Sequence, residues 1–263
     1  MKDLGQFETK KELFEYLVEN KTKLINMKKS TRKYSDSAYS SSVAKKSEET
    51  TKGHVEGSDL IKTIVGNTYN WMDSHDDVHL KNTFTKSISE KSKDVFHLHD
   101  HKFELDAIVG EPRKIFEQEI AWKSLGVNKS GTTQSLMMES KIIDDNKPNI
   151  FNAYKNGKIN QHSVGMQYVK LELAINDENE EEEFKVWNDH IDKIANKEKA
   201  EERGFFWAVQ EAKLIEISAV LRGSNELTPT IEGKQEPSYD TPEVTEAAKA
   251  LQEMRQLLTN LNI

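Results

Sequence analysis

The feature that most constrains this chain is the apolar alternation from residue 164 to residue 175, the longest strand pattern in the sequence. A period of two marks a strand with a buried face. The apolar positions change phase partway along, which predicts a bulge or bend near Gln167. The first phase holds Val164, Met166 and Tyr168, and the second holds Val169, Leu171, Leu173 and Ile175. The fold must supply a sheet around this strand.

Further segments share the strand pattern, and helical patterns separate them. Gly110-Glu111-Pro112 predicts a turn between two of the strands, and Gly157 predicts the end of a helix. The fold class predicted is therefore α+β and mainly β. Strands are expected at 95–101, 103–109, 114–122, 134–142, 204–209 and 212–221, and helices at 82–90, 148–157 and 184–202.

Composition divides the chain into a compact middle and polar ends. Hydrophobic residues make up 35% of the sequence and charged residues 31%, which is more polar than a uniformly folded globule. The stretches with few apolar residues lie on both sides of the middle. We predict an amphipathic helix at 1–28, a disordered linker at 29–58, a folded domain at 59–230, a second linker at 231–242 and an amphipathic helix at 243–263.

The two end helices differ in their expected roles. The first has two equal interpretations, packing on the domain or docking a partner. The last, beyond a linker, favours partner binding or self-association.

Bulk properties exclude several classes of protein. The chain has no cysteine, so disulfides, thiolate catalysis and cysteine-bound zinc are excluded. Its net charge of -8 argues against a general nucleic-acid binder. No apolar run approaches the ~18 residues of a membrane span, and no signal peptide is visible. These features predict a soluble protein made in a cytoplasm, without membrane or nucleic-acid partners.

Histidines gather in the segment His97-Leu98-His99-Asp100-His101. In a strand over 95–101, all three imidazoles share one face, as zinc ligands would. The pattern differs from the His-x-His-x-Asp-His signature of metallo-β-lactamase-like hydrolases because Asp100 follows His99 directly. A second polar cluster, Asp73 to Asp77 around His75, is more typical of an acidic turn than of a metal site.

Ser163 lies where a short helix gives way to the long strand, in the segment Asn160-Gln161-His162-Ser163-Val164-Gly165-Met166. A serine there is held by the strand and exposed at its mouth, and a glycine two residues later permits close approach of backbone. We interpret Ser163 as a nucleophile and His99 as its base. Glu216 interrupts the apolar strand 212–221. It is either harmless on an exposed face or a third group that orients a histidine.

Four motifs in chain order resemble the prohead (capsid maturation) serine proteases of tailed phages, which share a fold with the herpesvirus assemblin proteases. The resemblance covers about residues 60–230, and the order and spacing of the motifs carry it. The motifs are Asp77-Val78 through Phe84-Thr85-Lys86-Ser87-Ile88; His99-Asp100 followed by Ile108-Val109-Gly110; Tyr154-Lys155-Asn156-Gly157-Lys158-Ile159 with His162-Ser163-Val164-Gly165-Met166; and Leu214-Ile215-Glu216-Ile217-Ser218-Ala219-Val220.

The resemblance implies an assemblin-like antiparallel β-barrel surrounded by helices, and a serine endopeptidase that needs no cofactor or metal. Ser163 would attack a peptide carbonyl and His99 would move the proton. Assemblin-type proteases use a second histidine, so the third group is Glu216, His101 or His162. Backbone amides near Val164 and Gly165, or Arg203 or Arg222, would hold the oxyanion.

The implied partners are phage major capsid and scaffold proteins inside a procapsid assembling in the host cytoplasm, with self-cleavage and self-association. Two alternatives remain at this point. One is a metal-dependent hydrolase built on His97, His99 and His101. The other is a capsid scaffold or assembly protein without enzymatic activity.

Overall fold

The computed structural model describes residues 7–30, 60–144 and 148–231. All of these residues belong to one compact unit. Almost all of the two predicted linkers, and the predicted C-terminal helix, lie outside the described residues. No helix among the described residues is long and apolar enough to cross a membrane.

Eight strands form one sheet, and the predicted α+β class is confirmed. The hydrogen-bonded order is β2-β7-β3-β4-β5-β1-β8, and β6 pairs with β7. The strands are β1 (Ile61–Thr68), β2 (Asp77–His79), β3 (Phe96–His99), β4 (Ile108–Ala121), β5 (Thr132–Ile142), β6 (His162–Ile175), β7 (Phe205–Ala219) and β8 (Thr230–Ile231).

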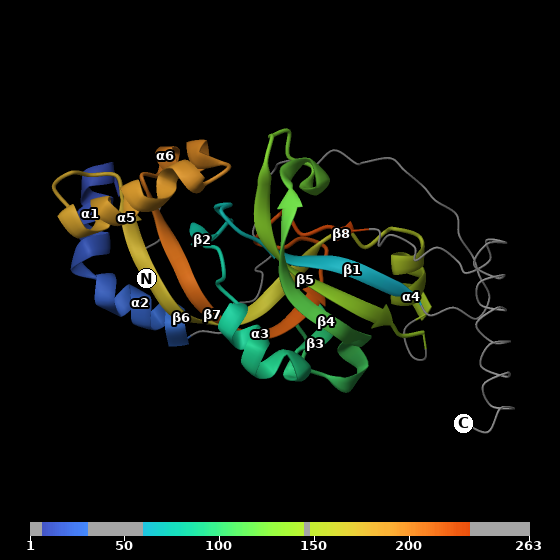
Figure 1. Ribbon diagram of the computed structural model, residues 1–263. Helices are drawn as coiled ribbons and strands as arrows, with labels where there is room; N and C mark the ends of the chain where they lie inside the picture. The colour runs from blue at the N-terminus through green and yellow to red at the C-terminus, as the bar shows by residue number, and fades with distance from the viewer. Residues whose placement is uncertain (1–6, 31–59, 145–147, 232–263) are drawn as a thin grey trace, which may run out of the picture. The chain divides into compact units, whose positions relative to one another are not determined.

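Six α-helices accompany the sheet in the described residues. Figure 1 shows α1, α5 and α6 beside the end of β6 and the start of β7. It shows α4 near the ends of β1 and β5. The helices are α1 (Lys10–Glu19), α2 (Lys21–Ser30), α3 (Thr85–Lys91), α4 (Pro148–Lys155), α5 (Glu181–His190) and α6 (Lys197–Arg203).

Strand β7 is the centre of the sheet. Along one edge it pairs antiparallel with β6 from His162↔Ala219 to Ile175↔Phe205. Its other edge pairs in parallel with β2 and then with β3. The predicted separate strands at 204–209 and 212–221 are wrong, because β7 is continuous. The sheet differs from the predicted antiparallel β-barrel in two ways: β2 and β3 pair with β7 in parallel, and no ladder among the described residues joins β6 to β8 to close it.

Strand β4 runs through the segment predicted to be a turn. Gly110, Glu111 and Pro112 all pair with β5, and the register shifts between Pro112 and Lys114. Proline lacks an amide donor, so within sheets it occurs at edges and bulges. The shift therefore accommodates Pro112 without ending the strand, and the predicted hairpin at 103–122 is a single strand beginning at Ile108.

The predicted N-terminal helix is two helices. Asn20 ends α1, and both its backbone N–H and its side-chain amide donate to the Tyr16 carbonyl. Phe14, Leu17 and Leu24 are buried in the main core. Of the two interpretations left open, the structure favours packing on the domain.

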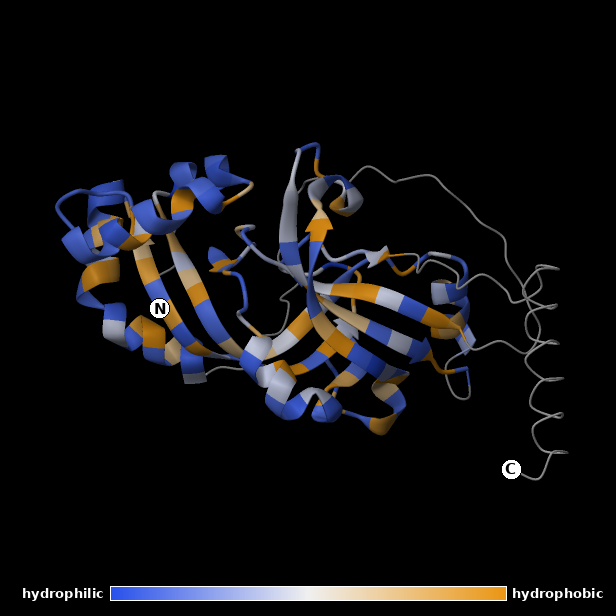
Figure 2. Ribbon diagram, viewed as in Figure 1, coloured by the Kyte–Doolittle hydropathy of each residue, from blue (hydrophilic) through white to orange (hydrophobic). Residues whose placement is uncertain are grey.

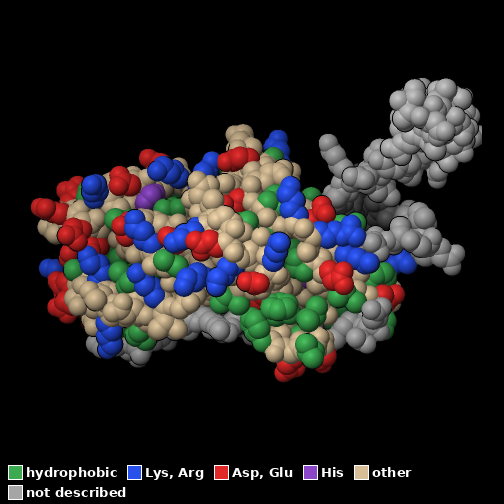
Figure 3. All heavy atoms as spheres, turned by 60° about the horizontal axis from the view of Figure 1, so that its bottom comes forward, with side chains coloured by type: hydrophobic (Ala, Val, Ile, Leu, Met, Phe, Trp, Pro, Cys, Tyr) green, Lys and Arg blue, Asp and Glu red, His purple; other side chains and the backbone are tan. Residues whose placement is uncertain are grey.

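The predicted long helix at 184–202 is likewise divided into α5 and α6. Asn196, just before α6, exchanges hydrogen bonds with the Met72 backbone through its side chain. The acidic run predicted to be a loop supplies the first turn of α5, where carboxylates interact favourably with the helix dipole. Figure 3 shows acidic side chains gathered at the end of the molecule where α1 and α5 lie.

The predicted strand signals around Ser163 are confirmed. β6 begins at His162, and its register against β7 shifts on both sides of Gln167. Figure 2 shows apolar residues alternating with polar ones along β6 and β7. α4 precedes β6, and Gly157 has the left-handed φ of +64° that the predicted helix ending requires.

Candidate active site

Ser163 lies directly opposite Ser218 in the β6–β7 ladder, and Gly165 lies opposite Glu216. Paired residues of an antiparallel ladder share a face, with Cβ atoms about 4.5–5.5 Å apart. Ser163 is 5% exposed, so the prediction that it is exposed at the mouth of the strand is wrong. Glu216 and Ser218 are fully buried. A polar group of three side chains therefore occupies one face of this strand pair.

Gly165 makes room for the Glu216 carboxylate. A Cβ atom at position 165 would collide with Oε1, Cδ and Cγ of Glu216. The glycine after Ser163 thus permits close approach, as predicted, and what approaches is a side chain of the same molecule.

The Glu216 carboxylate has a hydrogen-bond partner on each oxygen. Its Oε1 lies 2.5 Å from Nδ1 of His101, and its Oε2 accepts from the Ser218 hydroxyl at 2.5 Å. A buried carboxylate is costly unless such partners are present. The predicted role of Glu216, to orient a histidine, requires a contact with an imidazole nitrogen. Glu216 makes this contact with His101.

A left-handed turn carries His101. Asp100 and His101 have φ of 52° and 55°, a conformation that costs a non-glycine residue about 1–2 kcal/mol. β7 holds this turn, because the Asp100 N–H donates to the Ala219 carbonyl and the His101 N–H to the Ser218 hydroxyl. These hydrogen bonds hold His101 in a conformation that it would otherwise adopt rarely.

His99 lies elsewhere. It pairs with Ala219 in β3–β7, whereas Ser163 pairs with Ser218, so the two side chains extend from opposite faces of the sheet. Nδ1 of His99 is 3.4 Å from the carboxylate of Asp100. The structure brings together Ser163, Glu216 and His101, and it does not bring His99 to them.

His97 and His162 belong to a different cluster, on the other face of the strands. Tyr154 of α4 lies between them, with its hydroxyl 2.9 Å from Nε2 of His97 and 3.0 Å from Nε2 of His162. Nδ1 of His97 is 2.9 Å from the Ser140 hydroxyl, and Nδ1 of His162 is 2.9 Å from the Thr228 carbonyl.

These partners determine the tautomers. A carbonyl accepts, so His162 carries its proton on Nδ1 and accepts the Tyr154 hydroxyl at Nε2. The Tyr154 oxygen then accepts from Nε2 of His97, and Nδ1 of His97 accepts from Ser140. Burial lowers the pKa of His97 to about 3 and that of His162 to about 4, which keeps both neutral. The cluster fixes α4 and the start of β6 to the sheet.

The predicted zinc arrangement of His97, His99 and His101 is not formed. Strand β3 ends at His99, and His101 turns away to Glu216. Both ring nitrogens of His97 are occupied by Ser140 and Tyr154. These three histidines do not lie on one face.

Tyr154→Phe tests this cluster. Removing the hydroxyl leaves a donor on His97 and an acceptor on His162 buried without partners. We expect the free energy of unfolding to fall by about 2–4 kcal/mol. Urea denaturation at pH 8 measures it, with Tyr16→Phe near the surface as the control. A fall no larger than that of the control would contradict the network.

Asp73, His75 and Asp77 have ligand atoms within 4.8 Å of one another, a spacing that could hold a metal ion. Asp73 also caps a turn, as predicted, by accepting from the N–H groups of His75 and Asp77. Burial and the Asp77 charge raise the pKa of Asp73 to about 7. Lys28 pairs with Asp77, and the guanidinium of Arg203 lies 3.1 Å from Asp76.

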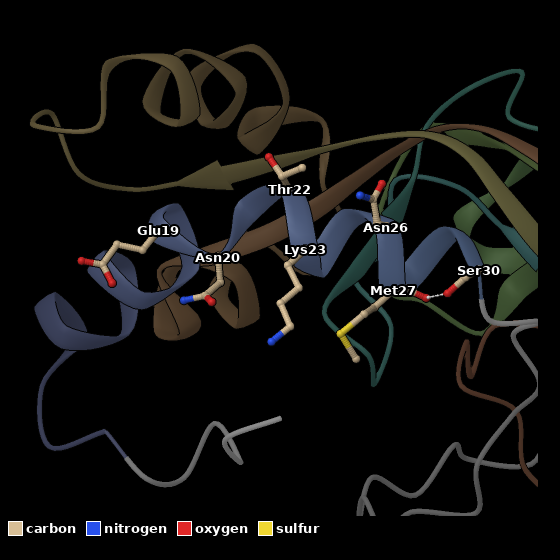
Figure 4. A pocket seen from close by; sticks show the side chains of 7 residues that line it. All are labelled: Glu19, Asn20, Thr22, Lys23, Asn26, Met27 and Ser30. Atoms are coloured by element: carbon tan, nitrogen blue, oxygen red, sulfur yellow. Dashed lines mark hydrogen bonds between the residues drawn. The ribbon is translucent and has the colours of Figure 1, made fainter.

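A hollow of about 590 Å³ runs along α2. Figure 4 shows Lys23 and Met27 extending on the same side of this helix, and Ser30 donating to the Met27 carbonyl. Its lining contains no histidine and none of the residues around Ser163, so it is separate from the Ser163 site. The lining residues are Glu19, Asn20, Thr22, Lys23, Asn26, Met27 and Ser30.

Two members of the Ser163 site were missed or misplaced by sequence reasoning. Ser218 stood in a quoted motif without a role, and its spacing of two from Glu216 on a strand was the signal that both share a face. His101 was considered as a third group, whereas the structure gives it the Glu216 contact.

Searches of protein-family models, curated proteins and solved structures found no match to this chain.

Proposed function

We propose that this chain is a serine endopeptidase in which Ser163 is the nucleophile, His101 the general base and Glu216 the group that orients His101. The observation that carries the proposal is the contact between Nδ1 of His101 and Glu216, on the strand face that also presents Ser163. A nucleophile, a base and an orienting carboxylate are the three parts of serine-protease chemistry.

The Glu216 contact sets the tautomer of the base. A carboxylate accepts, so the proton of neutral His101 resides on Nδ1, and Nε2 becomes the basic atom. Nε2 would take the Ser163 proton as Oγ attacks the substrate carbonyl, and would return it to the leaving amine. Glu216 stabilises the imidazolium formed between these steps.

The oxyanion that forms during attack needs hydrogen-bond donors. Of the two arginines predicted, Arg203 interacts with Asp76. Asp76 comes just before β2, which pairs with the half of β7 that is distant from Ser163. Arg222 follows the end of β7 closest to Ser163. Arg222 and the backbone amides after Ser163 remain as the donors in this proposal.

The resemblance described above supplies the biological part of the proposal. The chain would be a prohead protease with an assemblin-like domain, cleaving capsid and scaffold proteins and itself during procapsid maturation in the host cytoplasm. Self-association would bring copies together inside the shell. Both Ser163 and Glu216 stand within the motifs that resemble that family.

Intact mass over time tests the proposal. The wild type and Ser163→Ala would be expressed alone and with a candidate phage capsid protein. Fragments that form in the wild type and not in Ser163→Ala support a serine endopeptidase. Identical fragments in both would overturn the assignment of Ser163. Full-length proteins in every sample, including assembled shells, would favour the scaffold alternative.

Ser218→Ala tests the support of the base. The change removes a hydrogen bond to Glu216 and one from the His101 backbone. Hydrogen bonds to charged groups contribute about 1.5–3 kcal/mol, so kcat should fall by about tenfold to a hundredfold with little change in KM. Steady-state cleavage of a peptide measures both, with Ser140→Ala as a control on the other face. An unchanged kcat would remove Ser218 from the site.

A further inference from the structure

Behind the strand that carries Ser163 lies a small internal cavity of about 10 Å³. β1, β2, β6 and the segment after β7 all contribute to its wall. The lining is mostly polar, unlike the cores on either side. It consists of Gly66, Asn67, Asp73, His79, Ser163, Val164, Met166, Ser224 and Asn225.

Two of the lining side chains carry buried nitrogen atoms that have no hydrogen-bond partner among the described residues. Both ring nitrogens of His79 lack a partner, and so does the Asn67 amide nitrogen. His79 is 0% exposed and Asn67 is 1% exposed. A neutral imidazole carries one donor and one acceptor, and each costs about 1–3 kcal/mol when buried unsatisfied.

The size and the chemistry of the cavity match one water molecule. A cavity needs about 10–15 Å³ to hold a water, and the water needs two to four polar partners. The Asn67 amide donates, and His79 offers both a donor and an acceptor. A water can accept two bonds and donate two, so it can satisfy Asn67 and one nitrogen of His79 together.

A metal ion fits this region less well because two of the nearby carboxylates each already pair with a cation. Asp77 pairs with Lys28, and Asp76 with Arg203. Lys199 donates to the Asp73 carbonyl. Both carboxylate oxygens of Asp77 are engaged, by Lys28 and by the Tyr168 hydroxyl.

We propose that this cavity binds one ordered water molecule, held by His79 of β2 and Asn67 of β1. The water joins β1 and β2 beside Ser163 and Val164 of β6, which also line the cavity. It therefore supports β6, the strand that carries Ser163, from the interior of the domain. The proposal stands on the cavity and does not depend on the peptidase assignment.

A high-resolution crystal structure tests the proposal directly. The full chain with His101→Ala prevents self-cleavage without changing the cavity lining. A density peak about 2.7–3.2 Å from a His79 nitrogen and from the Asn67 amide supports the water. A cavity without density overturns it. An anomalous signal for a metal beside Asp73, His75 and Asp77 overturns it in favour of a cation site.

His79→Leu gives a second test, in which the sign of the effect decides. If a water is bound, the substitution removes one of the hydrogen-bond partners of that water, and the melting temperature should fall by about 2–8 °C. If the cavity is dry, an apolar side chain relieves an unsatisfied imidazole, and the melting temperature should rise. His190→Leu is the matched control, because Nδ1 of His190 also lacks a described partner and lies outside the cavity lining.

Discussion

His101→Ala should lower the rate of peptide cleavage by about 10²–10⁴-fold, the usual contribution of a general base. The reason is geometric. His101 is the histidine whose Nδ1 contacts Glu216, on the face of the β6–β7 pair that presents Ser163. His99→Ala should reduce the rate far less, because His99 extends from the opposite face.

The measurement is kcat/KM for a peptide taken from a cleavage site found by mass analysis. Far-ultraviolet circular dichroism of both variants checks that neither substitution has unfolded the domain. A larger loss in His99→Ala than in His101→Ala would reverse the assignment. Equal small losses in both would move the base away from this segment altogether.

Between pH 8 and pH 5, the two buried histidines of the Tyr154 cluster should together remove about 4 kcal/mol from the free energy of unfolding. His97 and His162 have pKa values of about 3 and about 4 in the folded protein because both are buried, against 6.5 for an ordinary histidine. A lowered folded pKa means that the unfolded chain binds more protons. The stability is therefore complete above about pH 6.5 and is lost as pH falls toward 4.

Each histidine contributes about 2 kcal/mol at pH 5, from 1.36 kcal/mol per pH unit below 6.5. Urea denaturation at pH 8, 6 and 5 measures the loss. His162→Gln should abolish about half of this pH dependence, whereas His99→Gln, which changes a partly exposed ring, should keep it. The same pH dependence in His162→Gln as in the wild type would show that His162 is not held neutral.

The strands around Ser163 could be predicted because their residues alternate and because one side of each is buried. The α+β class, the strand 134–142, the helix before Gly157 and the bulges near Gln167 follow from local pattern. The continuity of β4 and β7 could not be predicted. Gly110 and Pro112 resemble a turn, and a register shift against β5 absorbs them.

The candidate site was predictable in part for the same reason. Alternation placed Glu216 and Ser218 on one face, and the serine–glycine pair indicated a crowded position. The choice between His99 and His101 depends on where β3 ends. That point is decided by hydrogen bonds from the turn at Asp100 and His101 to β7, more than a hundred residues later in the chain. No local signal carries that information.

The central place of β7 has a consequence for when the proposed enzyme becomes active. His101 and Glu216 are 115 residues apart in sequence, and β7 is the last long strand to leave the ribosome. Until it pairs with β6 and β3, Ser163 has no oriented base, and the turn of His101 has no support. The growing chain thus carries its nucleophile for some fifty residues before it can cleave anything, because non-local pairing completes folding late. In the proposed enzyme, synthesis itself would delay the onset of proteolysis.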